Sequence, residues 1–204
     1  EEISVYSLWQ AVTVISFSIL APWIAIGRNK KNIAVGIFLF TIFVGPLPIV
    51  LRLLDPFIGI SIFPANGSDA LWYILLIHGC LTVSLGSLGF IFIGSMAMEI
   101  VEDVEASTGR REEGLLGTVN AFVHKLVGAG GVLIAGVIVS WSGFDDPNAT
   151  QEMLTGEVIN RFALVHMIIG FCLPIFSTLL VLMYSIDRKG HLDNVNDLGY
   201  VRDD

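Results

Sequence analysis

Five long stretches of the chain carry almost no charged residue. They cover about residues 3–26, 33–51, 70–98, 114–141 and 162–186. A helix needs roughly 20 apolar residues to cross a hydrocarbon core of ~30 Å, and each stretch is about that long or longer. Strands of a membrane barrel would be about half that length and would alternate strictly, which these stretches do not. The sequence therefore predicts an all-α, polytopic integral membrane protein with five transmembrane helices.

The composition excludes other broad classes. Only 15% of the 204 residues are charged, whereas a soluble domain carries about 25%. Buried core helices of a soluble protein would need a polar face for water, and the five apolar runs leave none. Acidic residues outnumber basic ones and the net charge is -8, so a nucleic-acid-binding protein is not indicated.

The basic residues indicate an orientation across the membrane. They cluster after the first, third and fifth stretches, at Arg28, Lys30, Lys31, Arg110, Arg111, Arg188, Lys189 and Arg202. The positive-inside rule then places the N-terminus of the chain outside and its C-terminus in the cytoplasm. We expect a helical bundle over residues 1–190, a cytoplasmic tail over 191–204, and a multi-pass location in the cell (inner or plasma) membrane.

The number of spans and one interruption point to a transporter architecture. Transporter folds are built from repeats, including halves of six helices made of three plus three. Five spans that begin outside fit the last five helices of such a half, so we expect a fragment whose N-terminal half lies outside this chain. The second span contains Gly45-Pro46-Leu47-Pro48, which predicts a bend or break because each proline removes a backbone donor.

Lys125 is the most unusual residue of the apolar stretches. It lies about eleven residues into the fourth one, or ~16 Å deep at 1.5 Å per residue. A charged lysine near the bilayer midplane costs about 2.5–3.5 kcal/mol, so it should face a partner or a water-filled cavity. The alternative is a structural lysine that is paired within the bundle.

Polar and small residues surround Lys125 at steps of three and four. They are Gly117, Asn120, Ala121, His124 and Gly128, and this spacing places them on one stripe of a helix. Such a stripe suits the wall of a solute pathway, because its side chains hydrogen-bond hydroxyl groups. A helix–helix contact with Asn120 as an interhelical hydrogen-bonding group is the alternative.

One segment resembles a known family. Residues 95–114 read S-M-A-M-E-I-V-E-D-V-E-A-S-T-G-R-R-E-E-G, and A-F-V-H-K-L follows at 121–126. These motifs resemble the glycoside–pentoside–hexuronide:cation symporters of the major facilitator superfamily, of which the melibiose permease is a familiar member. The resemblance covers essentially the whole chain and implies helices 8–12 of a major facilitator fold, a C-terminal half fragment.

The resemblance also implies roles for individual residues. Lys125 takes the place of a lysine that contributes to the coupled cation and sugar sites. Asn120, Ala121 and His124 fall where the melibiose permease lines its sugar site, and His124 replaces an apolar residue there. Phe90 falls at a pathway tryptophan, where an aromatic face could stack on a sugar.

The same resemblance implies a cytoplasmic gate. Glu99, which replaces the usual aspartate, and Arg111 match a charged pair in that gate. Glu105 belongs to the same run of charges. The inner loop could also be no more than a solvated loop whose ion pairs contribute ~0–1 kcal/mol each.

These observations predict part of a secondary active transporter, not an enzyme. We expect Na+- or H+-coupled symport of a sugar or related solute by alternating access, in a lipid bilayer, with no cofactor besides the coupling ion. Two alternatives stay open. One is a transporter of lysolipid or anionic solute in the same superfamily, in which His124 and Lys125 hold the anionic group. The other is a non-transporting membrane scaffold subunit.

Overall fold

The computed structural model of the chain describes residues 2–59, 63–65, 67–143 and 156–200. The described part is helical, without strands. Its helices, in chain order, are α1 (Glu2–Ala25), α2 (Lys30–Val44), α3 (Leu47–Ile58), α4 (Asp69–Thr108), α5 (Glu113–Ser142), α6 (Gly156–Leu182) and α7 (Arg188–Asp197).

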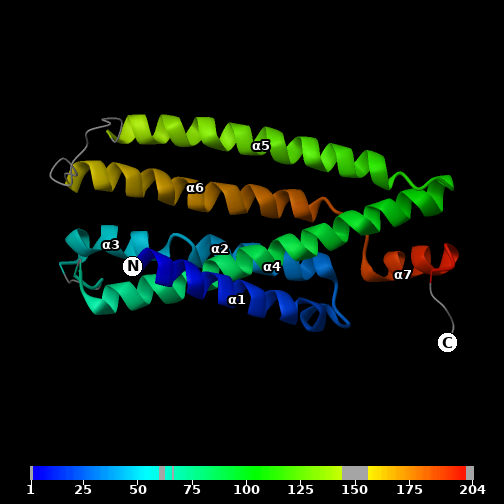
Figure 1. Cartoon of the computed structure of the whole chain (residues 1–204), viewed down its shortest axis with the longest axis horizontal. Helices are drawn as coiled ribbons and strands as arrows, with labels where there is room; N and C mark the ends of the chain where they lie inside the picture. The colour runs from blue at the N-terminus through cyan, green and yellow to red at the C-terminus, as the bar shows by residue number, and fades with distance from the viewer. Residues whose placement is uncertain (1, 60–62, 66, 144–155, 201–204) are drawn as a thin grey trace.

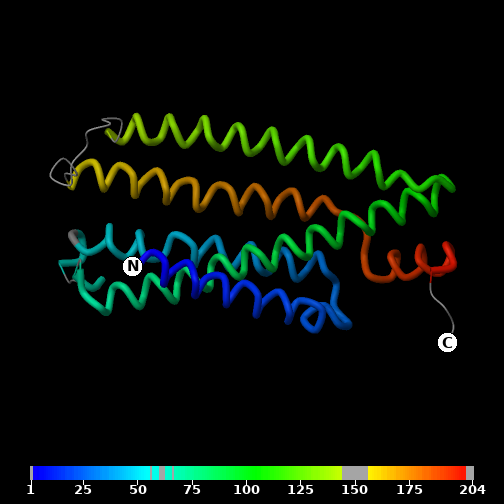
Figure 2. Tube along the Cα trace, in the orientation of Figure 1, coloured from blue at the N-terminus to red at the C-terminus, as the bar shows by residue number. Residues whose placement is uncertain are grey.

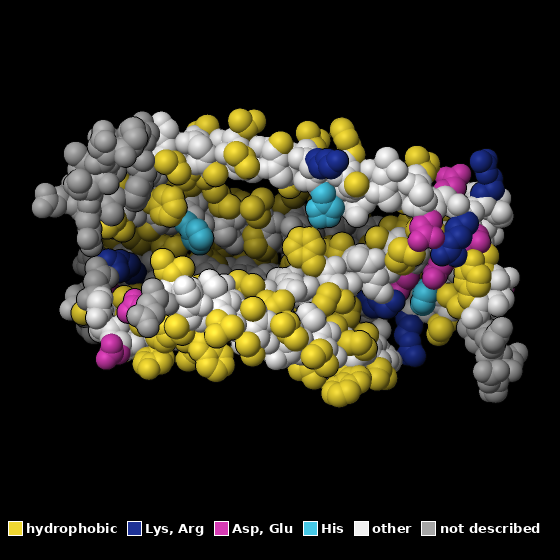
Figure 3. All heavy atoms as spheres, viewed as in Figure 1, with side chains coloured by type: hydrophobic (Ala, Val, Ile, Leu, Met, Phe, Trp, Pro, Cys, Tyr) yellow, Lys and Arg dark blue, Asp and Glu magenta, His cyan; other side chains and the backbone are white. Residues whose placement is uncertain are grey.

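Five helical segments are long and apolar enough to cross a membrane. They are Glu2–Ala25, Lys30–Asp55, Asp69–Thr108, Glu113–Ser142 and Gly156–Leu182. The predicted all-α class with five transmembrane helices is therefore confirmed. Hydrophobic side chains cover the flanks of these helices, whereas charged side chains gather where α4, α5 and α7 meet (Figure 3). That distribution suits a bundle whose sides face lipid and whose ends face water.

The second span is broken where the prolines predicted it. α2 ends at Val44 and α3 begins at Leu47. Pro48 has no N–H, so the Val44 carbonyl oxygen loses its helical donor. The Nε2 atom of His78 on α4 lies 2.7 Å from that oxygen. Because a carbonyl oxygen only accepts hydrogen bonds, Nε2 is the protonated ring nitrogen, and His78 supplies the donor that the Val44 carbonyl lacks at the break.

The core lies between α1, α2 and α4, and α6 packs on α2 (Figures 1 and 2). Its buried residues are Ala21, Ala34, Ile37, Leu88, Phe92 and Met96. The long helix α4 crosses the bundle diagonally, and α5 lies at its edge along α6 (Figure 1). With 40 residues, α4 is ~60 Å long at 1.5 Å per residue, about twice the hydrocarbon thickness. It therefore continues beyond residue 98, the end expected from hydropathy.

A short polar helix follows the last span. α7 begins after Asp187, whose side chain accepts a hydrogen bond from the Gly190 N–H at 2.8 Å. It packs against the end of α4 (Figure 1). Hydropathy predicts only a tail from residue 191, because the face of α7 toward α4 is polar rather than apolar, so this helix is a difference from the expectation. Residues 201–204 of that tail, Arg202 included, lie outside the described residues.

Candidate functional site

The predicted pathway residues share one surface of α5. Asn120, Ala121, His124 and Lys125 are all exposed. None of their side chains, that of Lys125 included, makes a hydrogen bond or ion pair with any residue that the structure describes. Gly117 and Gly128 on the same helix have open space where a Cβ would lie.

Phe90 does not join this stripe within the chain. It lies on α4 and is 68% exposed. α4 and α5 are connected at residues 109–112 and diverge from there (Figure 1).

Glu99 is a buried carboxylate with two strong partners. Its residue is 6% exposed, and the Nζ atom of Lys30 donates to its Oε1 at 2.6 Å. The Tyr184 hydroxyl donates to Oε2 at 2.5 Å. Burial, and next the hydrogen bond to Glu99, raise the pKa of the Tyr184 hydroxyl well above its usual range. Tyr184 thus keeps its proton and stays a donor at neutral pH.

Lys31 extends this network to the end of α6. Its Nζ atom donates to the Leu182 carbonyl oxygen at 2.9 Å and to the Tyr184 carbonyl oxygen at 2.6 Å. A cation at a helix C-terminus satisfies carbonyls that lack helical donors and is favoured by the helix dipole. Two consecutive lysines at the start of α2 therefore fasten that helix to α4 and to α6.

Arg111 occupies a separate, exposed cluster. It donates to Glu105 at 3.2 Å, to Glu113 at 3.0 Å and to the Tyr200 hydroxyl oxygen at 2.8 Å. Tyr200 in turn donates to Glu105 at 2.9 Å, and its ring centroid lies 5.7 Å from the guanidinium carbon. Hydrogen bonds to Glu113 and Tyr200 raise the pKa of Arg111, so it remains charged.

The structure does not bring Glu99 and Arg111 together as the gate pair that the resemblance implied. Glu105 lies six residues closer to the turn than Glu99, or ~9 Å along α4, so it reaches Arg111 and Glu99 does not. Sequence reasoning also missed Lys30, Tyr184 and Tyr200. The sequence did carry one signal for the Lys30–Glu99 pair. Glu99 stands at the end of an apolar run, and the positive-inside rule places it on the same side of the membrane as the basic turn that contains Lys30.

α7 adds two polar contacts to the end of α4. The Nδ1 atom of His191 lies 2.9 Å from Oε2 of Glu102, and Asn194 donates to Asp103 at 2.9 Å. Together with the Tyr200–Glu105 bond, these contacts follow the last two turns of α4 in order. The acidic residues expected in an inner loop therefore lie on the last turns of α4, where they hold a folded C-terminal segment.

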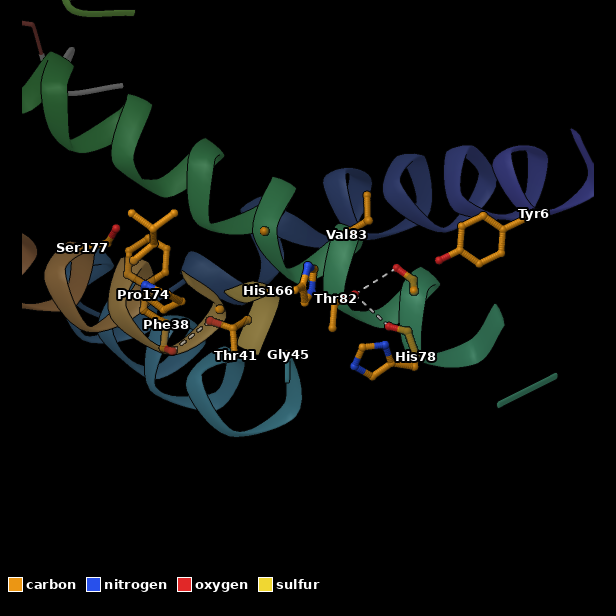
Figure 4. A pocket seen from close by; sticks show the side chains of 14 residues that line it. Tyr6, Phe38, Thr41, Gly45, His78, Thr82, Val83, His166, Pro174 and Ser177 are labelled. Atoms are coloured by element: carbon orange, nitrogen blue, oxygen red, sulfur yellow. Dashed lines mark hydrogen bonds between the residues drawn. The ribbon is translucent and has the colours of Figure 1, made fainter. Parts of the chain in front are cut away.

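A cavity of about 550 Å³ lies between α1, α2, α4 and α6 (Figure 4). Its polar lining residues are Tyr6, Thr41, His78, Thr82, His166 and Ser177. Tyr6 sits against the backbone of α4, since a Cβ at Gly79 would lie 1.8 Å from its hydroxyl oxygen. Within the described residues, no group of three or more His, Cys, Asp or Glu side chains could hold a metal ion.

Comparisons with known proteins agree with this architecture. The family described as MFS/sugar transport protein matches residues 1–188. Searches of curated proteins and of solved structures found no match. Because the family match covers nearly all of the 204 residues, the chain belongs to the MFS/sugar transport protein family.

Proposed function

We propose that the chain forms part of a Na+- or H+-coupled symporter for a sugar-like solute, with the Lys125 surface of α5 on its pathway. One observation carries the proposal. Lys125 lies midway along a membrane-spanning helix, exposed and without a partner in the described residues. Because a lysine in hydrocarbon costs about 2.5–3.5 kcal/mol, a water-filled cleft or another part of the transporter covers this surface.

Each residue of the stripe has a chemical task in this proposal. The amide of Asn120 and the imidazole of His124 donate and accept hydrogen bonds, which suits sugar hydroxyls. Lys125 lies next to them on the same face of α5, so its ammonium senses a cation or proton in the same cleft through Coulomb forces that are strong at low dielectric. Phe90, from α4, offers an aromatic surface on the other side of the cleft.

The two polar networks suit a bundle that moves as one body. The Glu99 network fastens α2, α4 and α6, and the Arg111 cluster fastens α4, the turn before α5 and the C-terminal segment. We place this end in the cytoplasm, on the positive-inside rule. In alternating access, one such bundle rocks against another around a site near the midplane. In this proposal a second bundle, outside this chain, forms the other side of that site.

Lys125→Leu in the whole transporter tests this function. We expect coupled uptake of a radiolabelled sugar into vesicles to be lost, while thermal stability stays the same or rises because an unpaired charge is gone. Lys189→Leu, which removes an exposed cation on α7, is the matched control and should transport normally. Normal uptake by Lys125→Leu would contradict the role proposed for Lys125, whereas no uptake by the wild-type transporter would favour a scaffold.

A second candidate rests on the neighbours of Lys125. No carboxylate among the described residues pairs with His124 or Lys125, so the two side chains could together hold an anionic solute such as a lysolipid. Competition assays separate the two candidates. A neutral sugar should displace the transported solute in the first case, and only an anionic analogue in the second.

A further inference from the structure

The structure points to a second binding site, at the opposite side of α4 from α5. We propose that a groove between α1 and α4 binds one anionic phospholipid, whose phosphate lies between Lys30 and Arg188. This site goes beyond the proposed function, because it uses none of the residues of the α5 stripe.

The groove has the size and the walls that a lipid tail requires. Its volume is about 550 Å³, within the range of ~300–1,000 Å³ that is usual for ligand sites. Pro22 and Ala25 of α1 and the following Ile26 form one wall, and Ile91 and Phe92 of α4 form the other. Both helices are membrane spans, so the groove opens at the depth of the hydrocarbon chains.

The charged side chains that line the groove are both cations. Lys30 is the first residue of α2, and Arg188 is the first residue of α7. No carboxylate is among the described residues that line the groove. Dark blue side chains accordingly lie beside the hydrophobic flank of α1 at this end (Figure 3). Glu99 neutralises Lys30, so Arg188 supplies the net positive charge of the groove lining, and this charge favours an anionic partner.

Both cations have free hydrogen-bonding capacity. Arg188 is exposed and makes no hydrogen bond or ion pair with the part of the chain that the structure describes. Lys30 uses one of its three donors for Glu99, and its side chain is 27% exposed. A phosphate at this position would therefore gain two cationic donors without breaking the Glu99 network.

The apolar walls favour a lipid over a free anion. Soluble phosphate would use only the two cations, whereas a phospholipid also buries its acyl chain against α1 and α4. Basic pockets between transmembrane helices are known to bind anionic head groups, and each cation contributes about 1 kcal/mol. Trp23, 68% exposed on α1 close to this end, suits the interfacial region of the same leaflet.

Native mass spectrometry of the whole transporter, titrated with phosphatidylglycerol, tests the site. We expect one tightly bound phosphatidylglycerol, no comparable binding of phosphatidylcholine, and about fivefold weaker binding in Arg188→Gln, the factor for one lost cation. Arg28→Gln is the matched control. It removes the same charge from an exposed arginine in the α1–α2 turn that does not line the groove, and it should bind as the wild type does.

Further variants and ligands separate the possible outcomes. Ser95→Leu narrows the groove between its walls and should weaken the binding of phosphatidylglycerol. The melting temperature of this variant should stay near that of the wild type. Equal weakening by Arg28→Gln and Arg188→Gln would mean diffuse attraction and would overturn the site. Glycerol phosphate that displaces the lipid at equal concentration would show a soluble-anion site. An unchanged affinity for phosphatidylglycerol in Arg188→Gln would overturn the lipid site, and an acidic segment of the transporter would then be the occupant to test for in the groove.

Discussion

Glu99→Ala is the substitution that most directly probes what holds the basic end of the bundle together. It removes the acceptor of Lys30 and of Tyr184 at once. Tyr184 has one other acceptor, the Met96 carbonyl oxygen at 3.4 Å, which is too distant for a strong O–H···O bond. The start of α2 and the segment after α6 would therefore both lose their strong polar contact with α4.

The structure sets the size of the effect. Breaking a fully buried ion pair by removing one partner costs about 3–5 kcal/mol, because the other charge remains buried. The Lys30 side chain is 27% exposed, so water can solvate part of its ammonium group. We therefore expect a loss of about 2–3 kcal/mol in the free energy of unfolding, below the range for a fully buried pair.

Equilibrium unfolding of the purified transporter in mixed micelles measures this loss. Glu157→Ala is the control, because Glu157 pairs with Arg161 on an exposed surface of α6 and such pairs contribute only about 0.3–0.5 kcal/mol. A double-mutant cycle with Lys30→Gln isolates the coupling of the pair. If Glu99→Ala costs no more than Glu157→Ala, or if the coupling is below about 0.5 kcal/mol, the network does not fasten these helices.

Three further outcomes follow from the described contacts. Gly79→Ala should lower the melting temperature because its Cβ would lie 1.8 Å from the Tyr6 hydroxyl oxygen, whereas Gly86→Ala, with open space, should not. His78→Phe leaves the carbonyl that closes α2 unpaired and should cost about 1–3 kcal/mol in chemical unfolding. The pKa of Tyr184 is raised in the folded protein, so the protonated hydroxyl contributes its full share of the free energy of unfolding at neutral pH. This contribution falls above about pH 10, where the hydroxyl of the unfolded chain loses its proton. Stability measured between about pH 9 and 11 should therefore decline less in Tyr184→Phe.

The position of Lys125 shows how far sequence reasoning extends into the candidate site. Periodicity alone placed Asn120, His124 and Lys125 on one face of a helix, and α5 carries them in that arrangement. Periodicity does not state what lies opposite that face. The roles of these residues remain a prediction that the transport assay will test.

The hydropathy of the chain, its prolines and its motifs determined the class of this protein. The number of spans, the break at Gly45 to Pro48 and the family resemblance all follow from residues that are close together in the chain, because burial in lipid and the missing proline donors act locally. These signals do not depend on how the helices pack against one another.

Only the tertiary structure decided which charges meet. Lys30 and Glu99 are 69 residues apart, and Tyr184 and Glu99 are 85 residues apart. Their contacts depend on how the ends of α2, α4 and α6 converge, and the same packing docks α7 on α4 and opens the groove beside Arg188. Ion pairs need partners within about 4 Å, and that proximity is a property of helix packing, which no single segment of sequence encodes.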